Sequence, residues 1–486
     1  MTSVRRALAL SFAERYALIA IALCSNILVA RLLTPEQIGI YSVSLAVISI
    51  AQVLREFGIG NFLIQEKNLS EAHIRTTFGI SLLIGSGLFV IVYFIAPFAG
   101  NFYSKVQMVQ TLRISALNFL TLPFCTISLA LLRRDMAFNQ LVIVNLIAAS
   151  MSSAMTIGLA YWGFGPNSMA IGAVVGNIAT GIGAWIARSD RKLLLPGFSE
   201  WRAILRFGSQ SSLANIVTTI SMDINDLVLG KMLGFAPVAM ISRAKGLMNL
   251  FHQELMSAIR NVAFPAFARA HREGESIEAR HIFSVSAVTV IAWPLYGFTA
   301  LFALEILRLM FGPQWDEAAS LVPIFCLAGA VAATSNLVLS AILAIGRIDL
   351  VTKFELIFQP LRAALIVGAA MIFQSLIACA IAFCVAFVIY TPFVYTIKER
   401  CIPNNYRNLC MNLWASFKVT LITLALPAAF AVHLGLDRNT PANPITLITV
   451  AAFSAISWLI ALIIFKHPVT TDPLFSRFTS KLPDFA

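Results

Sequence analysis

The sequence has few charged side chains for its size. Asp, Glu, Lys and Arg make up 12% of its 486 residues, whereas a soluble domain carries about 25%. Hydrophobic residues make up 59%, and the mean hydropathy is +0.83. Charged residues are too few to cover the surface of a protein of this size in water. Most of its surface must therefore face lipid. The composition therefore excludes an ordinary soluble protein.

The sequence also lacks the usual signatures of metal sites and of catalysis. Its seven cysteines show no CxxC and no Cys/His ligand spacing, so we interpret them as small core residues. There is no Walker A pattern and no HExxH motif, and no loop is long enough for a soluble catalytic domain. We therefore expect no catalytic residue, no metal and no cofactor, and we predict that the protein is not an enzyme.

Long apolar runs are what the sequence has instead. A transmembrane helix needs about 20 mainly apolar residues. Fourteen runs meet that rule, near 12–33, 38–62, 75–97, 112–132, 139–162, 168–187, 207–230, 236–264, 282–311, 318–345, 351–373, 375–397, 414–434 and 445–465. An even number of spans places both termini on the same side of the membrane.

The basic residues indicate which side that is. Most of the 35 Lys and Arg residues fall in the two termini and in the loops on the same side. Cytoplasmic loops of membrane proteins are enriched in Lys and Arg, so we predict that both termini are cytoplasmic. This bias accounts for most of the net charge of +12, and it removes the reason to expect nucleic acid as a partner.

The chain resembles itself at an offset of 200 residues. Residues Ile27–Ser44 align with Leu227–Ala244, so that Arg31 falls on Lys231, and at the same offset Asn26, just before this stretch, falls on Asp226. Two halves that insert the same way up are related by an axis along the membrane normal, with a cavity between them. The sequence thus predicts an all-α integral membrane protein with two pseudo-symmetric six-helix bundles around a central cavity, plus two C-terminal helices. The expected parts are an N-terminal bundle over 1–190, a basic cytoplasmic linker over 191–206, a C-terminal bundle over 207–400, two additional helices over 401–466 and a cytoplasmic tail over 467–486.

One stretch of the chain resembles a known family. ARLLTPEQIGIYSVSLAVISIAQVLREFGIGNFLIQEKNLSEAHIRTTF, residues Ala30–Phe78, resembles the opening of the polysaccharide biosynthesis flippases of the Wzx type, closest to the WzxC-like branch. Their superfamily also contains lipid II flippases and multidrug exporters. The resemblance implies a monomer in the bacterial inner membrane, whose central cavity opens alternately to either side. It implies that the cargo is an undecaprenyl-pyrophosphate-linked oligosaccharide, moved to the periplasmic leaflet for exopolysaccharide, capsule or O-antigen synthesis, with a polymerase and co-polymerase as partners.

Basic residues lie inside the predicted spans, where an ionisable side chain usually faces a cavity or a partner. Lys245, His252 and Arg260 belong to one polar stripe on the eighth span, and Arg243 lies close to it in the sequence. A pyrophosphate that leaves water is compensated by Arg or Lys. The candidate residues of a cationic substrate cavity are Arg31, Arg55, Arg243, Lys245, His252 and Arg260. The alternative for Arg55 and Arg260 is that their long side chains reach the headgroups.

Two carboxylates lie on the seventh span. Asp223 and Asp226 are three residues apart, so they share a helix face. Three interpretations remain open: they pair with Arg243 or Lys245, they bind a coupling proton or Na⁺, or they contact sugar hydroxyls. The first half has Leu23 and Asn26 at the matching positions, which favours an asymmetric ion site.

The alternative function is a small-molecule exporter of the same superfamily, coupled to H⁺ or Na⁺. It would explain Asp223 and Asp226 well, but exporters of cationic drugs need an acidic cavity, and the charges inside these spans are mostly basic. A membrane polymerase or ligase would need a large periplasmic loop, which the sequence lacks.

Overall fold

The computed structural model describes residues 2–56, 59–188, 195–199, 201–250, 252, 256–435 and 443–471. Every regular element within these ranges is a helix. The chain forms two compact units, Met1–Ala239 and Met240–Ala486, which are described separately below. The boundary between them falls later than the linker expected at 191–206, which lies partly outside the described residues. The expected division into bundles stays a prediction.

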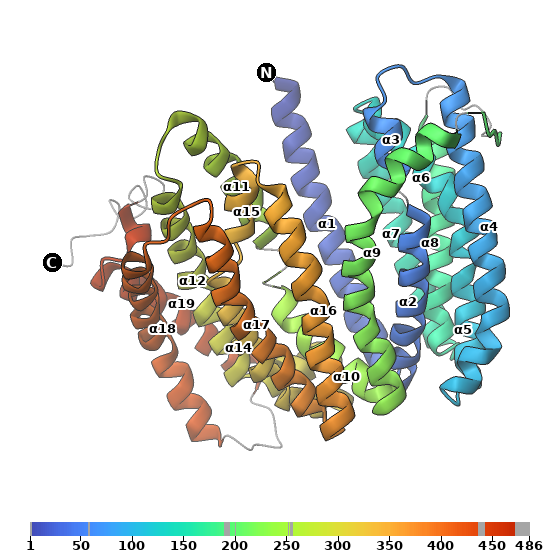
Figure 1. Cartoon of the computed structure of the whole chain (residues 1–486). Coiled ribbons are helices and arrows are strands. Elements are labelled where there is room, and N and C mark those ends of the chain that lie inside the picture. Colours follow the sequence, from blue (N-terminus) through green and yellow to red (C-terminus); the bar gives the residue numbers. More distant parts are fainter. Residues whose placement is uncertain are drawn as a thin grey trace. The chain divides into compact units, whose positions relative to one another are not determined.

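Unit 1 is a helical bundle in which helices distant in the sequence pack together. Helix α7 packs on α8 and on α1, while α2 packs mainly on α9 and α5. The close packing of α4, α6, α7 and α8 can be followed in Figure 1. The elements of this unit are α1 (Thr2–Leu32), α2 (Pro35–Glu56), α3 (Ile59–Gln65), α4 (Glu71–Phe102), α5 (Val106–Ala116), α6 (Asn118–Arg134), α7 (Phe138–Tyr161), α8 (Pro166–Ala187) and α9 (Trp201–Met232).

Unit 2 is built around α12. This helix packs on α14 and α18, and α17 packs on both α14 and α16. Helix α10 (Phe235–Asn249) begins in unit 1 and ends in unit 2. The other elements are α11 (Met256–Glu273), α12 (Ile277–Leu301), α13 (Ala303–Phe311), η2 (Pro313–Ser320), α14 (Val322–Ala333), α15 (Val338–Ala344), α16 (Ile348–Phe373), α17 (Leu376–Glu399), α18 (Tyr406–Leu434), α19 (Pro444–Ile464) and η3 (Pro468–Thr471).

The prediction of a multi-pass membrane protein is confirmed. Among the described residues, 12 helical segments are long and apolar enough to cross a membrane, and each overlaps one of the predicted spans. The two predicted spans without such a segment are 207–230 and 236–264. The first coincides with α9, and the second with α10 followed by α11, between which residues 251 and 253–255 lie outside the described ranges.

The Thr-Pro-Glu-Gln turn before α2 is a helix start with two reciprocal hydrogen bonds. The Gln37 amide N–H donates to Thr34 Oγ1 over 3.3 Å, and the Thr34 N–H donates to Gln37 Oε1 over 3.0 Å. This is a capping box with proline at the first helical position, where its missing N–H costs nothing. Two residues further on, Gly39 lets the backbone of Phe235 approach: a Cβ there would lie 1.9 Å from the Phe235 carbonyl oxygen. The turn therefore fixes both the start and the close packing of α2.

The loop after α3 is held by Arg134 at the end of α6. One terminal nitrogen of Arg134 donates to the carbonyl oxygens of Leu63 (2.8 Å) and Glu66 (2.6 Å), and the other donates to Lys67 (3.4 Å). These are the carbonyls that a helix leaves unsatisfied at its C-terminus, where a cation is favourable. Arg134 thus fixes the Ile-Gln-Glu-Lys segment.

We expect Arg134→Ala to lower the free energy of unfolding by about 1.5–3 kcal/mol, because hydrogen bonds from a charged donor are worth that much. The measurement is the shift in thermal unfolding midpoint of the purified protein. Arg133→Ala is the matched control, because the neighbouring Arg133 is exposed and its removal should change the midpoint little. Equal shifts in the two variants would contradict the role of Arg134.

The last residues that the structure describes are hydrogen-bonded to α12 and α18. His467 is fully buried, and its Nε2 lies 3.1 Å from Ser286 Oγ and 3.0 Å from Ser416 Oγ. On α19, the Trp458 indole donates to the Val290 carbonyl over 2.8 Å. Helix α18 therefore packs closely on α12, and hydrogen bonds join the segment from Trp458 to His467 to the same helix.

A charged cluster is buried where α12 begins and α17 ends. The Lys398 ammonium, which is fully buried, donates to Glu278 Oε2 and lies 3.3 Å from His281 Nδ1. The Asn405 backbone N–H donates to the other Glu278 oxygen over 3.0 Å. This cluster joins α12, α17 and the loop before α18.

Candidate substrate-binding face

Two of the predicted cations lie against an aromatic face of α17 in unit 2. The Lys245 ammonium lies 5.4 Å from the ring centroid of Phe383, within the range of a cation–π contact. The His252 ring stands edge-on to Phe387, with centroids 6.5 Å apart. Phe383 and Phe387 are four residues apart on α17, so they share a side of that helix. Lys245 on α10 and His252 beyond the end of α10 each contact one of these rings.

The aromatic face continues along α17, and side chains of α14 and α16 pack against it. Phe383 and Phe387 have centroids 5.1 Å apart, and Phe387 and Tyr390 have centroids 6.1 Å apart. Phe325 of α14 packs against Phe383 at 5.2 Å, and Phe358 of α16 packs against Tyr390 at 4.6 Å. The rings are therefore held rigidly. We call Phe383, Phe387 and Tyr390 the α17 aromatic face.

A polar stripe on α16 adjoins one end of this face. Glu355, Gln359 and Arg362 follow one another at spacings of four and three, so they share a side of the helix. The Gln359 amide donates to Glu355 Oε2 over 2.5 Å, and the Tyr390 ring packs on Phe354 and Phe358 of the same helix. Carboxylate, amide, guanidinium and phenol are therefore gathered inside the membrane-spanning part of unit 2.

Arg243 has a different environment from Lys245. Its guanidinium lies 4.9 Å from the ring centroids of both Phe311 and Trp315, which belong to α13 and η2. It is 8% exposed, so it is packed into the segment between α12 and α14. Arg243 therefore stacks on aromatic rings outside the α17 aromatic face.

Arg260 lies on α11 and is held by a polar partner. Its guanidinium donates to Asn336 Oδ1 over 3.1 Å, and Asn336 stands between α14 and α15. The side chain of Arg260 is therefore directed into unit 2 at this contact.

Arg55 is buried in unit 1. It is 3% exposed, and its guanidinium lies 3.4 Å from Thr126 Oγ1 on α6. This placement favours the interior of the unit over the headgroup region for Arg55. Its contact with a substrate stays a prediction.

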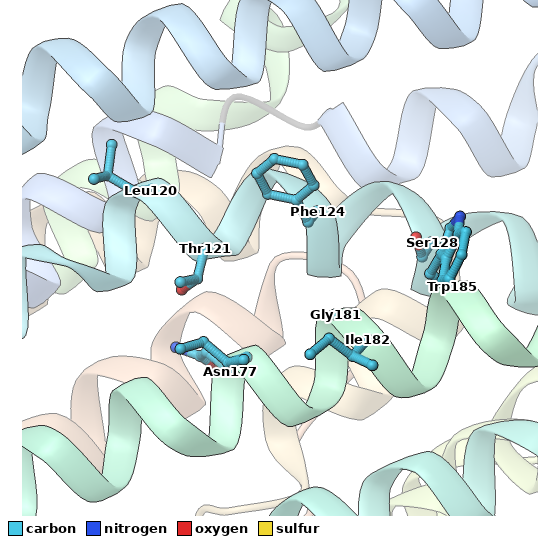
Figure 2. Close-up of a pocket in the computed structure, with 9 residues that line it drawn as sticks. Leu120, Thr121, Phe124, Ser128, Asn177, Gly181, Ile182 and Trp185 are labelled. Atoms are coloured by element: carbon cyan, nitrogen blue, oxygen red, sulfur yellow. The ribbon is translucent and has the colours of Figure 1, made fainter. Parts of the chain in front are cut away.

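A pocket of about 390 Å³ lies between α6 and α8 in the same unit. Figure 2 shows Thr121 and Asn177 toward one end and Ser128 and Trp185 toward the other. Asn177 is fixed by Asn118, to whose Oδ1 it donates over 2.7 Å. The remaining lining residues are apolar or glycine, and Arg55 is not among them. The pocket therefore does not bring the predicted cations together.

The remaining predicted residues also lie in unit 1. Arg31 is exposed in the last turn of α1, and Asp223 and Asp226 are partly buried on α9. Because Arg243 and Lys245 belong to unit 2, the expected pairing across the turn and the ion site both stay predictions.

The part of the site that the sequence did not predict is the α17 aromatic face and the α16 stripe. Together with Lys245 and His252 they offer one ammonium charge, an imidazole, flat apolar rings and hydrogen-bonding groups. Such a combination suits an anionic ligand that also carries polar and apolar surface.

Comparisons with known proteins agree with this architecture. A family model described as "Polysaccharide biosynthesis protein" matches residues 28–320. The chain is 23% identical over 466 residues to the lipopolysaccharide biosynthesis protein WzxC of Escherichia coli K12, covering 94% of this chain and 92% of that protein. It is 24% identical over 296 residues to the succinoglycan biosynthesis transport protein ExoT of Rhizobium meliloti, covering 60% and 59%. Among solved structures, the lipid II flippase MurJ in an inward closed conformation superposes with a TM-score of 0.74 at 13% identity, covering 95% of this chain and 99% of that one.

Proposed function

The chain belongs to the family of polysaccharide biosynthesis proteins, whose model covers more than half of it, and we propose that it moves a lipid-linked oligosaccharide across the membrane. The observation that carries the proposal is the α17 aromatic face with Lys245 and His252 beside it, inside a fold shared with a lipid II flippase. An anionic headgroup that leaves water needs such positive charge. Sugar rings add hydroxyl groups and apolar faces, which the polar stripe and the aromatic rings suit.

The finer features of the proposal come from the relatives and the sequence. We take the cargo to be an undecaprenyl-pyrophosphate oligosaccharide, carried by alternating access from the cytoplasmic to the periplasmic leaflet. The names of WzxC and ExoT, which refer to lipopolysaccharide and succinoglycan biosynthesis, support a repeat unit of a surface or secreted polysaccharide. We place both termini in the cytoplasm on the distribution of Lys and Arg. A polymerase and a co-polymerase would receive the product.

The experiment that tests this function compares lipid extracts from cells with and without the gene, in a background that keeps the neighbouring glycosyltransferases. We expect the polyprenyl-pyrophosphate oligosaccharide to accumulate on the cytoplasmic leaflet of the cells that lack the gene, and mass spectrometry would identify the repeat unit. Restoring the gene should return the lipid to its normal level. Normal lipid and normal exopolysaccharide in the deletion strain would contradict the proposal.

A small-molecule exporter remains the second candidate function, because Asp223 and Asp226 suit a coupling-ion site and multidrug transporters share the fold. The same strains separate the two functions. An exporter would leave the lipid unchanged and make the deletion strain sensitive to small toxic compounds.

A further inference from the structure

A groove of about 830 Å³ lies between α11 and α12 in unit 2, and none of the functional residues above lines it. Its α11 wall contains Val262, Ala263 and Ala266, and its α12 wall contains Phe283 and Ala287. Val262 is 72% exposed, so this wall is open to the surroundings of the unit.

The groove exists because the two helices diverge after a tight turn. Gly274 in the turn has φ of 71°, a left-handed conformation that glycine adopts without strain. Helix α11 then packs more extensively on α15 than on α12, and Pro265 lies inside it, where proline kinks a helix. The small side chains of Ala263, Ala266 and Ala287 leave the space between the helices unfilled.

Positive charge stands at one end of the groove. Arg280, in the first turn of α12, lines it, and the last turn of α11 carries His271 and Arg272 before the helix ends at Glu273. Arg280 contacts Glu275 through one terminal nitrogen, and a guanidinium has five N–H donors. An anionic oxygen can therefore be bound beside Glu275 or in its place.

The length of the groove matches one leaflet of a bilayer. From Arg280 to Ile291, the last lining residue on α12, the helix rises by about 16 Å at 1.5 Å per residue. Half of the hydrocarbon core is about 15 Å. Charge at the headgroup level and an apolar wall one leaflet deep fit a phospholipid better than a polyprenyl chain, which is longer than one leaflet.

We propose that the groove between α11 and α12 binds one anionic phospholipid from the leaflet that faces the α11–α12 turn. Its phosphodiester contacts Arg280, and its acyl chains lie between Val262 and Phe283. By the predicted topology this is the cytoplasmic leaflet. The proposal does not depend on the transported substrate.

The test is native mass spectrometry of the full-length protein in detergent, titrated with phosphatidylglycerol and with phosphatidylethanolamine of the same acyl chains. We expect the wild type to bind phosphatidylglycerol about fivefold more tightly, because this is the affinity difference that one exposed ion pair can contribute. Arg280→Gln should remove the preference. Glu275→Gln should increase it, because the competing carboxylate is gone. Ala287→Leu should weaken the binding of both lipids by filling the groove.

Arg347→Gln is the matched control, because Arg347 is an exposed arginine that also pairs with a carboxylate, Asp349, but lies on another loop. It should keep the wild-type preference. An unchanged preference in Arg280→Gln, or an equal loss in Arg347→Gln, would overturn the proposal. Displacement of phosphatidylglycerol by undecaprenyl phosphate in the wild type but not in Arg280→Gln would also overturn it, and would assign the groove to a polyprenyl lipid.

Discussion

Replacing Lys398 with alanine is expected to destabilise unit 2 by about 3–5 kcal/mol, the usual effect of leaving a buried charge without its partner. Lys398 is fully buried, and its ammonium donates to Glu278. Without it, the Glu278 carboxylate keeps the backbone N–H of Asn405 and the His281 ring, whose Nδ1 lies 3.8 Å from Oε2, but no buried ammonium compensates its charge. The loss should appear as a large fall in the thermal unfolding midpoint of the purified protein.

Two further variants separate charge from packing. The double variant Lys398→Met with Glu278→Gln removes both charges and keeps their approximate shapes, so it should lose less stability than Lys398→Ala. Arg308→Gln breaks an ion pair with Asp316 that is more exposed, and it should change stability by less than about 1 kcal/mol. A double variant that is less stable than Lys398→Ala would show that the ion pair does not account for the effect.

The second large effect is expected on transport. Lys245→Ala should reduce the export of polysaccharide at least about tenfold at normal protein level, because a charge-assisted contact is worth about 1.5–3 kcal/mol. Lys245→Arg should keep much of the activity, because it keeps the charge beside Phe383. The measurement is exopolysaccharide yield in the deletion strain complemented with each variant, normalised to protein in the membrane.

Arg243→Ala is compared with Lys245→Ala in the same transport and stability measurements. We expect it to reduce transport too, but with a lower unfolding midpoint, since removing the guanidinium uncovers Phe311 and Trp315. Full transport in Lys245→Ala would remove Lys245 from the proposed substrate-binding face, whatever the result for Arg243.

The membrane fold could be predicted from the sequence because its signal is local. Each span is a continuous apolar run, and the 12 segments found in the described residues all coincide with predicted spans. The capping box at Thr34 is equally local, since four consecutive residues supply every group that forms it.

The α17 aromatic face could not be predicted in the same way. Phe383, Phe387 and Tyr390 occur in a helix that is apolar on all sides, so neither hydropathy nor spacing distinguishes a ring that meets Lys245 from one that meets lipid. The α16 stripe did carry a signal, because Glu355, Gln359 and Arg362 recur at helical spacing inside an apolar run. That the stripe lies beside Tyr390 could not be predicted, because it depends on the packing of α16 on α17.

Long-range charge pairing was also beyond the sequence. Glu278 and Lys398 are separated by 120 residues and lie at opposite ends of their own helices. Each resembles an ordinary charge at the end of a span, and only the fold shows that they are buried together. Arg243 is similar, because its two aromatic partners belong to the segment between two spans.

The contacts of His467 make the last two helices an integral part of unit 2, although they were expected as an addition to a six-helix bundle. Ser286 and the Val290 carbonyl of α12 have their partners in the segment from Trp458 to His467. A chain shortened before α18 would leave these groups of α12 facing lipid, where an unsatisfied polar group is costly. The C-terminal pair is therefore unsuited to exchange between homologues as a separate module, and a chimera needs α12, α18 and α19 from the same parent.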